Sequence, residues 1–441
     1  MTSPPDDPHA PGGPAPAEVI PIGRKKKTAA PLKPLPLIEH SWQLLLRYNA
    51  RNELTRDPGN AALILTNDQE WAGALQYDEF ADRVTWLKLP PAITGLTGPA
   101  VGDALADHHI VYCQHWLAKF HFTSFTREAI TGALVQSARS HTIHPVRDYL
   151  RGLQWDGRLR IHNWLTTYLH ASEDDTSHHV GRLWLISAVA RVMDPGCQAD
   201  HLLVLEGAQG SGKSTAARVM GGPWYLGNLP DLRDKDSQQV LRGKWIIEIA
   251  ELDAIRGSAQ TRVKEYLTRT VETYRPAYGE YFVDQRRQCV FMATTNDDHY
   301  LQDATGARRY WPVATGRLDR KALERDRDQL WAEAHQAYLQ GEQWWPNEEL
   351  TEQLVAVQDD RYQTDDWQAK IEAHLDPDLN VSAPSEVSIG DLLSTPLGLP
   401  PGQHTISHQT RVGAIMKRLK WRKIRGRLGK SRLWKYARPL I

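Results

Sequence analysis

A short glycine-rich segment constrains the fold of this chain more than any other part of its sequence. Residues 207–214 spell GAQGSGKS and fit the pattern G-x-x-x-x-G-K-[ST], directly after the apolar run 201–205 (HLLVL). In such a loop, glycines let backbone N–H groups close on phosphate oxygens, and the following helix N-terminus adds partial positive charge. The segment therefore predicts a strand, a phosphate-binding loop and a helix. The alternative is a glycine turn that binds nothing.

The predicted nucleotide-binding residues are the whole loop and the residue after it. Lys213 is expected to place its ammonium on the β- and γ-phosphates, and Ser214 to ligate Mg²⁺ through its hydroxyl. The expected cofactors are therefore ATP and Mg²⁺. The full set is Gly207, Ala208, Gln209, Gly210, Ser211, Gly212, Lys213, Ser214 and Thr215. Because kinases, transporters, GTPases and motors share this loop, the loop alone does not define a function.

Two further apolar runs, 245–250 (WIIEIA) and 289–293 (CVFMA), alternate with helical patterns and predict an α/β fold with a largely parallel sheet. Glu251, just past the first run, is the expected carboxylate for Mg²⁺ or for the attacking water. Glu248 interrupts that run. A buried carboxylate is unfavourable unless it is paired or bound to metal, so Glu248 is also expected near the site. A surface ion pair is the alternative for either residue.

Polar residues after the second run complete the predicted site. Asn296 ends the triplet TTN, where an amide can sense the γ-phosphate or hold the hydrolytic water. Alone, such a triplet is usually a turn. Arg308 and Arg309 follow in LQDATGARRYWPV, and a guanidinium stabilises charge on a transferring γ-phosphoryl group, often from a neighbouring subunit. An ordinary pair of surface arginines is the alternative.

Charge is divided unevenly along the chain. The 53 basic and 53 acidic residues cancel, yet residues 341–391 hold 13 acids and two bases, and residues 401–441 hold 12 bases and no acid. Helical patterns over 387–393 and 409–419, with a hairpin through Gly426 and Gly429, predict a winged-helix-like DNA-binding domain. Its candidate DNA contacts are Arg411, Lys417, Arg418, Lys420, Arg422, Lys423 and Arg425. The alternatives are a solvated tail and pairing with the acidic segment.

Other classes of protein fit the sequence poorly. It has no apolar run of about 18 residues and no apolar stretch at its start, so neither a membrane span nor a secretory signal is expected. Cys113, Cys197 and Cys289 lie too far apart for a zinc site or a disulfide framework. We therefore expect a cytoplasmic protein with no membrane partner.

Several motifs in this order resemble the virulence-associated protein E family, a group of ATPases of phages, prophages and mobile genetic islands. The likeness covers residues 135–315 and is carried by HPVRDYLRGLQWDGRLRIHNW, LEGAQGSGKST, GKWIIEIAEL, KEYLTRTVETYRPAYG, FMATTN and DATGARRYWPV. This family is similar to the helicase half of phage and plasmid primase-helicases. The resemblance therefore implies a P-loop NTPase of the AAA+/superfamily 3 helicase type.

The resemblance also implies roles for individual residues. Glu251 matches the Walker B acid, Asn296 the sensor 1 position, and Arg308 and Arg309 the paired arginines, one of which serves as the finger. Glu248 departs from the family, because it stands three residues before Glu251 where an adjacent acidic pair is usual. This leaves open which acid meets Mg²⁺.

The same family likeness extends to partners. Lys264 and Arg275 match a basic segment that carries DNA-contacting elements in the ring channel of the helicases. A homo-hexamer in a bacterial cell or a phage-infected host is the implied assembly. Since no primase motif precedes residue 135, a primase would be a separate chain.

These observations predict a disordered tail over 1–36, an N-terminal domain over 37–135, a helical collar over 136–199, the ATPase core over 200–318, an acidic helical segment over 319–380 and the basic domain over 385–441. Helices are expected over 130–137, 146–153, 163–170 and 180–193. The predicted function is an ATP-dependent DNA helicase in the replication of a phage, prophage or mobile element. The alternatives are an NTP-gated DNA-binding switch that does not unwind DNA, and a small-molecule kinase.

Overall fold

The fold was analysed in a computed structural model. The structure describes residues 41–227, 229, 237–252, 258–275, 281–301, 307–361, 366–428 and 431–439. The predicted tail over 1–36 and the predicted wing residue Gly429 lie outside these ranges. Within them, none of the helices combines the length and apolar character needed to cross a membrane.

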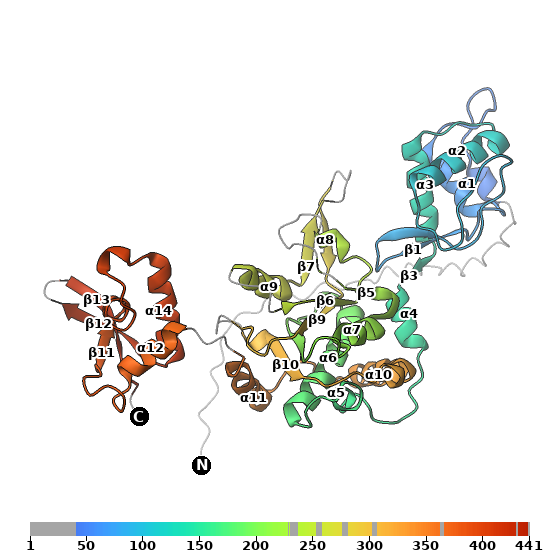
Figure 1. Cartoon of the computed structure of the whole chain (residues 1–441). Helices are drawn as coiled ribbons and strands as arrows, with labels where there is room; N and C mark the ends of the chain where they lie inside the picture. Colours follow the sequence, from blue (N-terminus) through green and yellow to red (C-terminus); the bar gives the residue numbers. More distant parts are fainter. Residues whose placement is uncertain are drawn as a thin grey trace, which may run out of the picture.

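The first unit is a small α/β domain with its own core (Figure 1). Strand β1 pairs antiparallel with β2 and parallel with β3, which gives the order β2-β1-β3. The edge-to-face pair of Trp71 and Trp116, with ring centroids 5.3 Å apart, lies in this core. Its elements are η1 (Ser41–Leu45), α1 (Pro58–Asn67), β1 (Leu75–Asp78), β2 (Arg83–Trp86), α2 (Asp107–His121), α3 (Arg127–Arg139) and β3 (Thr142–Ile143).

The predicted end of this domain at residue 135 falls inside α3, whose Ala138 is part of the first core. The boundary lies instead between β3 and α4 (Pro145–Gly152). There His144 adopts an extended conformation, accepts a hydrogen bond from the Arg147 N–H at 3.2 Å and caps α4, and Pro145 occupies the first helical turn. A residue before proline avoids the helical region, which explains why the chain changes element here.

The central unit contains a parallel sheet in the order β10-β4-β9-β6-β5. This confirms the predicted α/β fold with a parallel sheet. Strands β4, β6 and β9 are buried along their whole length, as expected for apolar runs in a parallel sheet covered on both faces. The strands are β4 (Leu202–Glu206), β5 (Tyr225–Leu226), β6 (Ile246–Ile249), β9 (Val290–Thr295) and β10 (Tyr310–Ala314).

Helices cover both faces of this sheet. One core joins α6, α7 and α10 to residues such as Leu203 and Met292, and the other joins α9 to Val204 and Phe291. A hairpin of β7 (Val271–Tyr274) and β8 (Val283–Arg286) lies between α9 and β9 in the chain. The helices are α4, α5 (Trp164–Leu169), α6 (Asp175–Met193), α7 (Lys213–Gly221), η2 (Gly222–Trp224), α8 (Ser237–Val240), α9 (Ser258–Thr268), η4 (Ala307–Arg309), α10 (Arg320–Leu339) and α11 (Glu348–Asp359).

The predicted collar is not a separate domain, because α6 packs directly on the sheet. The Trp184 indole N–H donates to the Phe291 carbonyl at 2.9 Å, and the Trp245 indole N–H donates to the Ala188 carbonyl at 2.8 Å. Helix α10, predicted to belong to the acidic segment, is part of the same core through Trp331. Elements from α4 to α11 therefore form one unit.

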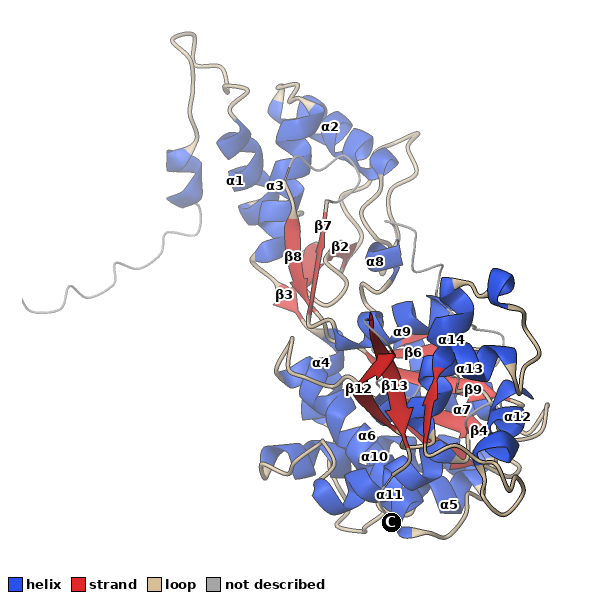
Figure 2. Ribbon diagram, turned by 90° about the vertical axis from the view of Figure 1, so that its left-hand side faces the viewer, coloured by secondary structure: helices blue, strands red, loops and turns tan. Residues whose placement is uncertain are grey.

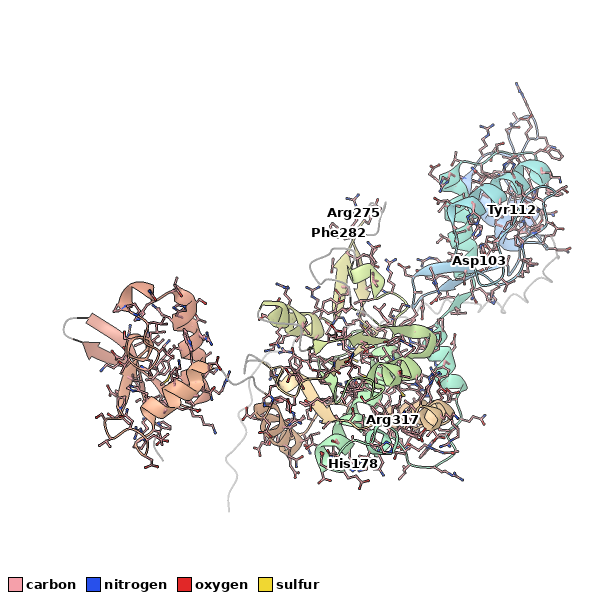
Figure 3. All side chains as sticks on the ribbon, viewed as in Figure 1. Asp103, Tyr112, His178, Arg275, Phe282 and Arg317 are labelled. Carbon is pink, nitrogen blue, oxygen red and sulfur yellow. The ribbon has the colours of Figure 1, made fainter. Side chains whose placement is uncertain are left out.

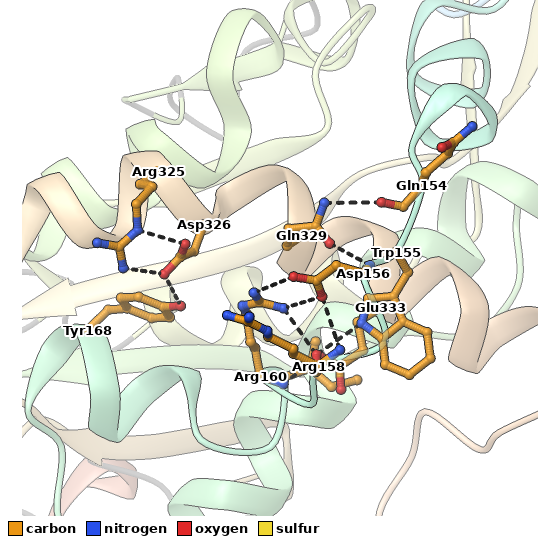
Figure 4. Close-up of polar contacts among 11 residues, drawn as sticks. Gln154, Trp155, Asp156, Arg158, Arg160, Tyr168, Arg325, Asp326, Gln329 and Glu333 are labelled. Carbon is orange, nitrogen blue, oxygen red and sulfur yellow. Dashed lines mark hydrogen bonds and ion pairs between the residues drawn. The ribbon is translucent and has the colours of Figure 1, made fainter.

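Polar contacts also fasten α10 to the segment before α5 (Figure 4). Asp156, in the predicted turn, receives two hydrogen bonds of 2.7 Å from Arg160. Glu333 of α10 accepts the backbone N–H groups of Arg160 and Ile161 at 2.6 and 3.0 Å. These contacts satisfy backbone donors that the irregular segment would otherwise leave unpaired.

The last unit begins earlier than the sequence indicated. Its core includes Ile371 and Leu375 of α12, which was predicted to belong to the acidic segment, together with Val412 and Tyr436. The predicted linker over 377–384 is therefore internal to this unit. Strands β11, β13 and β12 form an antiparallel sheet in that order beside α13 and α14 (Figure 2). The elements are α12 (Asp366–Leu375), β11 (Glu386–Ser388), α13 (Ile389–Ser394), η5 (Pro401–Gln403), α14 (Ile406–Arg418), β12 (Arg422–Leu428) and β13 (Ser431–Ala437).

Candidate nucleotide site and DNA-facing surfaces

The glycine loop joins the end of β4 to the start of α7, as its sequence predicts. Gly207, Gly210 and Gly212 have backbone φ angles of +151°, +79° and +99°. Residues that carry a side chain rarely adopt such angles. A Cβ on Gly207 would lie 2.6 Å from the Thr315 carbonyl oxygen, and one on Gly212 would lie 2.7 Å from the Leu318 Cβ. Both the backbone conformation and the close approach of residues 315–318 therefore require glycine.

A cavity of 360 Å³ opens where the loop meets the carboxyl ends of β6 and β9. It brings together the predicted phosphate-binding residues, Glu251 and Asn296. Gly207, Ala208 and Ser211 shape the loop behind it. The lining residues are Gln209, Gly210, Gly212, Lys213, Ser214, Thr215, Ala250, Glu251, Thr294, Thr295 and Asn296. Loops after neighbouring parallel strands meet at one edge of the sheet, which is why residues far apart in sequence converge here.

Lys213 is held in place by the loop itself. Its side chain is buried, and its Nζ donates to the Gly207 and Ala208 carbonyls at 2.7 and 2.9 Å. It also lies 3.1 Å from the Asn296 Oδ1. The ammonium therefore connects the loop to the end of β9.

The two acids have different environments. Glu248 is 1% exposed, accepts a 2.9 Å hydrogen bond from the Thr294 hydroxyl and is also hydrogen-bonded to the Tyr225 hydroxyl. Glu251 is exposed, has a φ of +51° and lines the cavity. Glu248 thus orients Thr294 from behind the cavity wall, whereas the Glu251 carboxylate faces the cavity.

Oxygen ligands suited to Mg²⁺ are present in the same cavity. The Ser214 hydroxyl and the Glu251 carboxylate both line it, and each belongs to an exposed residue. Mg²⁺ is usually held by one or two protein oxygens together with phosphates and waters. These residues therefore fit the predicted metal role.

Arg308 and Arg309 do not lie in this cavity. They precede β10, which runs parallel to β4 with Tyr310 beside Leu202, so they lie at the opposite edge of the sheet from the loop. There they line a larger cavity of 740 Å³ with Trp344 and other side chains. The Arg309 Nε is 3.6 Å from an Asp200 carboxylate oxygen. The two arginines therefore do not meet the phosphate loop of their own chain.

The structure supports only one of the two DNA contacts predicted between β6 and β9. Lys264 is 7% exposed on α9, so its side chain is not on the surface, and the predicted DNA contact is not supported. Arg275 is exposed at the end of β7, near Phe282 at the outer end of the hairpin (Figure 3). Tyr281 and Phe282 are 78% and 74% exposed and were not identified from the sequence. Two adjacent aromatic residues shortly after Arg275 were the sequence signal that could have shown them.

The predicted basic residues of the last unit are mostly on its surface. Arg411 lies over the Trp367 ring at 4.1 Å, and Lys423 and Arg425 lie over the 54%-exposed Trp434 at 4.9 and 5.6 Å. The others divide by exposure: Lys417, Lys420 and Arg422 are exposed, whereas Arg418 is half-buried and donates to the Gln368 amide oxygen at 2.8 Å. Internal pairing also occurs, since Lys435 lies 3.4 Å from Glu386.

A buried ion pair beside the loop was missed by the sequence analysis. Glu206, one residue before Gly207, is 4% exposed and lies 3.1 Å from the Arg361 guanidinium. The Tyr300 hydroxyl donates to the same carboxylate at 2.9 Å, and burial next to this anion raises the pKa of Tyr300 well above its usual value. The acid at the end of an apolar run was the available signal, as it was for Glu251.

Comparison with curated proteins finds no match. Among solved structures, the chain is similar to the apo structure of the NrS-1 C-terminal region (305–718), at 12% identity and a TM-score of 0.46, covering 83% of this chain and 96% of that one. The A form apo structure of the same region gives 13% identity and a TM-score of 0.46, covering 87% and 100%. Residues 150–363 match the model of the virulence-associated protein E-like domain, which confirms the family resemblance predicted from the sequence.

Proposed function

We propose that this chain is an ATP-driven DNA helicase that acts in the replication of a phage, prophage or other mobile genetic element. One observation carries the proposal: Lys213, Ser214, Glu251 and Asn296 share a cavity at the carboxyl edge of a parallel sheet. A phosphate-binding loop, an exposed carboxylate and an amide in one cavity match the requirements of γ-phosphoryl transfer from ATP to water. The family match over residues 150–363 supports the same reading.

Each residue then has a defined task in hydrolysis. Lys213 neutralises charge on the β- and γ-phosphates, and Ser214 and Glu251 are the proposed Mg²⁺ ligands. A Mg²⁺ ion held by these two residues would supply positive charge that offsets the charge developing on the phosphates. Asn296 holds the attacking water in line with the γ-phosphorus, from its position 3.1 Å from the Lys213 Nζ.

The strand arrangement supports a P-loop NTPase of the AAA+/superfamily 3 helicase type. Strand β9, which ends next to Asn296, lies between the loop strand β4 and the acidic strand β6. All three polar strand ends therefore reach one cavity. The β7–β8 hairpin directly before β9 is the element proposed to contact DNA through Arg275 and Phe282.

The arginine pair supports a ring. Because Arg308 and Arg309 lie at the opposite sheet edge, they can complete only the nucleotide site of another copy. Such head-to-tail contacts are heterologous, and they close into rings when the rotation allows it. We propose a homo-hexamer in which one of the two arginines contacts the neighbouring γ-phosphate.

The last unit is the proposed winged-helix-like DNA-binding module. Its order of helix, strand, two helices and hairpin suits that fold, and its cations stack on exposed Trp434. Interleaved cations and aromatics neutralise phosphates and stack on bases, so binding should weaken as salt rises. If priming is needed, we propose that a separate primase supplies it.

The test is the ATPase rate with and without single-stranded DNA, together with the mass of the assembly in ATP. We expect DNA-stimulated hydrolysis by a hexamer, and Lys213→Ala should reduce turnover about 100-fold or more, because it removes a charge aimed at the transition state. Lys370→Ala, at an exposed position of α12, is the matched control and should retain activity. Unimpaired turnover in Lys213→Ala would contradict the assigned site.

An NTP-gated DNA-binding switch is the second candidate. It is favoured by the separate core of the last unit, which gives the chain a basic module built independently of the sheet. Strand displacement on a forked duplex distinguishes the two, since a switch binds the fork in ATP without releasing a strand.

A further inference from the structure

A second cavity adjoins the phosphate site along the outer face of α7. Its volume is 330 Å³, and Thr215 lines both cavities. The other lining residues come from α7, from the residue that follows it and from the first turns of α10, which lies beside α7 (Figure 1). They are Arg218, Val219, Gly222, Arg320, Glu324 and Arg327.

The spacing on α7 fits a ligand that extends from the loop. Thr215, Arg218 and Val219 stand three and four residues apart, so they share one helix face. At about 1.5 Å per residue, Arg218 lies ~7.5 Å along the axis from Lys213. A nucleotide whose phosphates occupy the loop has its ribose and base next along this face.

The side chains suit those two groups. The Glu324 carboxylate can accept hydrogen bonds from ribose hydroxyls, as acidic residues do in dinucleotide sites. The exposed Arg218 guanidinium already lies over the Tyr225 ring at 5.8 Å, and its planar face can stack on a purine. Glu324 is itself oriented by a 2.7 Å contact with Arg320.

Arg327 provides a separate sign of an absent partner. Its Nε donates to the Met220 carbonyl at 3.3 Å, which fixes the guanidinium on α7. Its Nη2 is buried and, among the described residues, has no hydrogen-bond acceptor. This Nη2 atom faces Gly222 at the cavity wall, since a Cβ built on Gly222 would lie 2.7 Å from the Nη2 atom. A buried donor without an acceptor is unfavourable, so the Arg327 side chain would gain a partner by turning toward a ligand oxygen or ring nitrogen in the cavity.

We propose that this second cavity is the ribose and base subsite of the nucleotide, with Arg218 and Glu324 as its specificity-determining residues. The inference rests on the proposed function of the phosphate site. The proposal gives α10 a role in nucleotide specificity, which the loop motif alone does not provide.

Calorimetric titration of the full chain with ATP, 2′-deoxy-ATP and inorganic tripolyphosphate tests the proposal. Arg218→Ala and Glu324→Gln should each weaken ATP binding about tenfold, the effect of losing one hydrogen bond or stack to a charged group. Tripolyphosphate binding should stay unchanged, because it occupies only the loop. Glu324→Gln should also bind ATP and 2′-deoxy-ATP equally, whereas the wild type should prefer ATP.

The control is Arg325→Ala, an exposed α10 residue that pairs with Asp326 outside the cavity and should bind all three ligands normally. Equal weakening of ATP and tripolyphosphate, or unchanged ATP binding in both variants, would overturn the subsite while leaving the phosphate site in place. If the wild type binds neither ATP nor tripolyphosphate, or if Lys213→Ala binds both normally, the proposed function fails and the subsite fails with it.

Discussion

Replacing Arg361 by methionine tests whether the ion pair behind the phosphate loop stabilises the central unit. The Arg361 Nε lies 3.2 Å from one Glu206 oxygen, and its Nη2 lies 3.1 Å from the other. Side-chain exposure is 20% for the arginine and 5% for the acid. Methionine retains much of the aliphatic volume but leaves the Glu206 carboxylate buried with Tyr300 as its remaining hydrogen-bond donor among the described residues.

The expected loss can be set from this geometry. Removing one partner of a buried ion pair costs about 3–5 kcal/mol. Because Arg361 is one-fifth exposed, water can reach part of the pair, and we expect the lower end, about 3 kcal/mol. In a domain of 150–250 residues, each kcal/mol lowers Tm by about 2–4 °C, so the expected decrease in Tm is ~6–12 °C.

Thermal unfolding followed by tryptophan fluorescence measures this decrease. The double variant Glu206→Gln with Arg361→Met should recover part of the loss, since it removes the stranded charge as well. Arg325→Ala is the control: its pair with Asp326 is 71% exposed on the arginine side, and such pairs contribute little. A decrease below about 1 kcal/mol for Arg361→Met would refute the reasoning.

Two further predictions follow from buried and exposed aromatic contacts. Burial against the Trp311 ring lowers the pKa of His201 to about 3. Between pH 6.5 and 3, the unfolded chain therefore binds a proton that the native chain does not. The free energy of unfolding should fall by about 1.4 kcal/mol per pH unit as the pH drops through this range. His201→Phe should flatten this dependence in urea titrations from pH 4 to 7, and parallel curves would contradict it. Phe282→Ala should weaken single-stranded DNA binding by about 1–3 kcal/mol in fluorescence anisotropy with little change in Tm, whereas Trp345→Ala, an exposed aromatic near the arginine pair, should bind DNA normally. Unchanged binding by Phe282→Ala would remove the hairpin from the proposed DNA path.

Local sequence patterns were sufficient for the loop and for three strands of the central sheet. Glycines at 207, 210 and 212 have the positive φ angles that the motif requires, and the apolar runs became the strands β4, β6 and β9. Such patterns depend on residues adjacent in the chain, so they can be recognised without knowing what packs around them. The separation of the phosphate loop from the paired arginines, by contrast, depends on strand direction.

The tertiary structure decided the features that depend on distant partners. It distinguished the cavity-facing Glu251 from the enclosed Glu248, and it buried Lys264, which the family resemblance had suggested as a DNA contact. It also assigned α12 to the last core, because the apolar face of that helix shares a core with α13 and α14 and not with the central parallel sheet.

The sequence by itself thus predicted a phosphate-binding loop, because that motif lies within nine consecutive residues. Only the tertiary structure decided what surrounds this loop: the pair of Glu206 with Arg361, 155 residues apart, and the second cavity between α7 and α10. Burial and ion pairing are properties of the packed chain, so an isolated acid or arginine in the sequence does not reveal its partner.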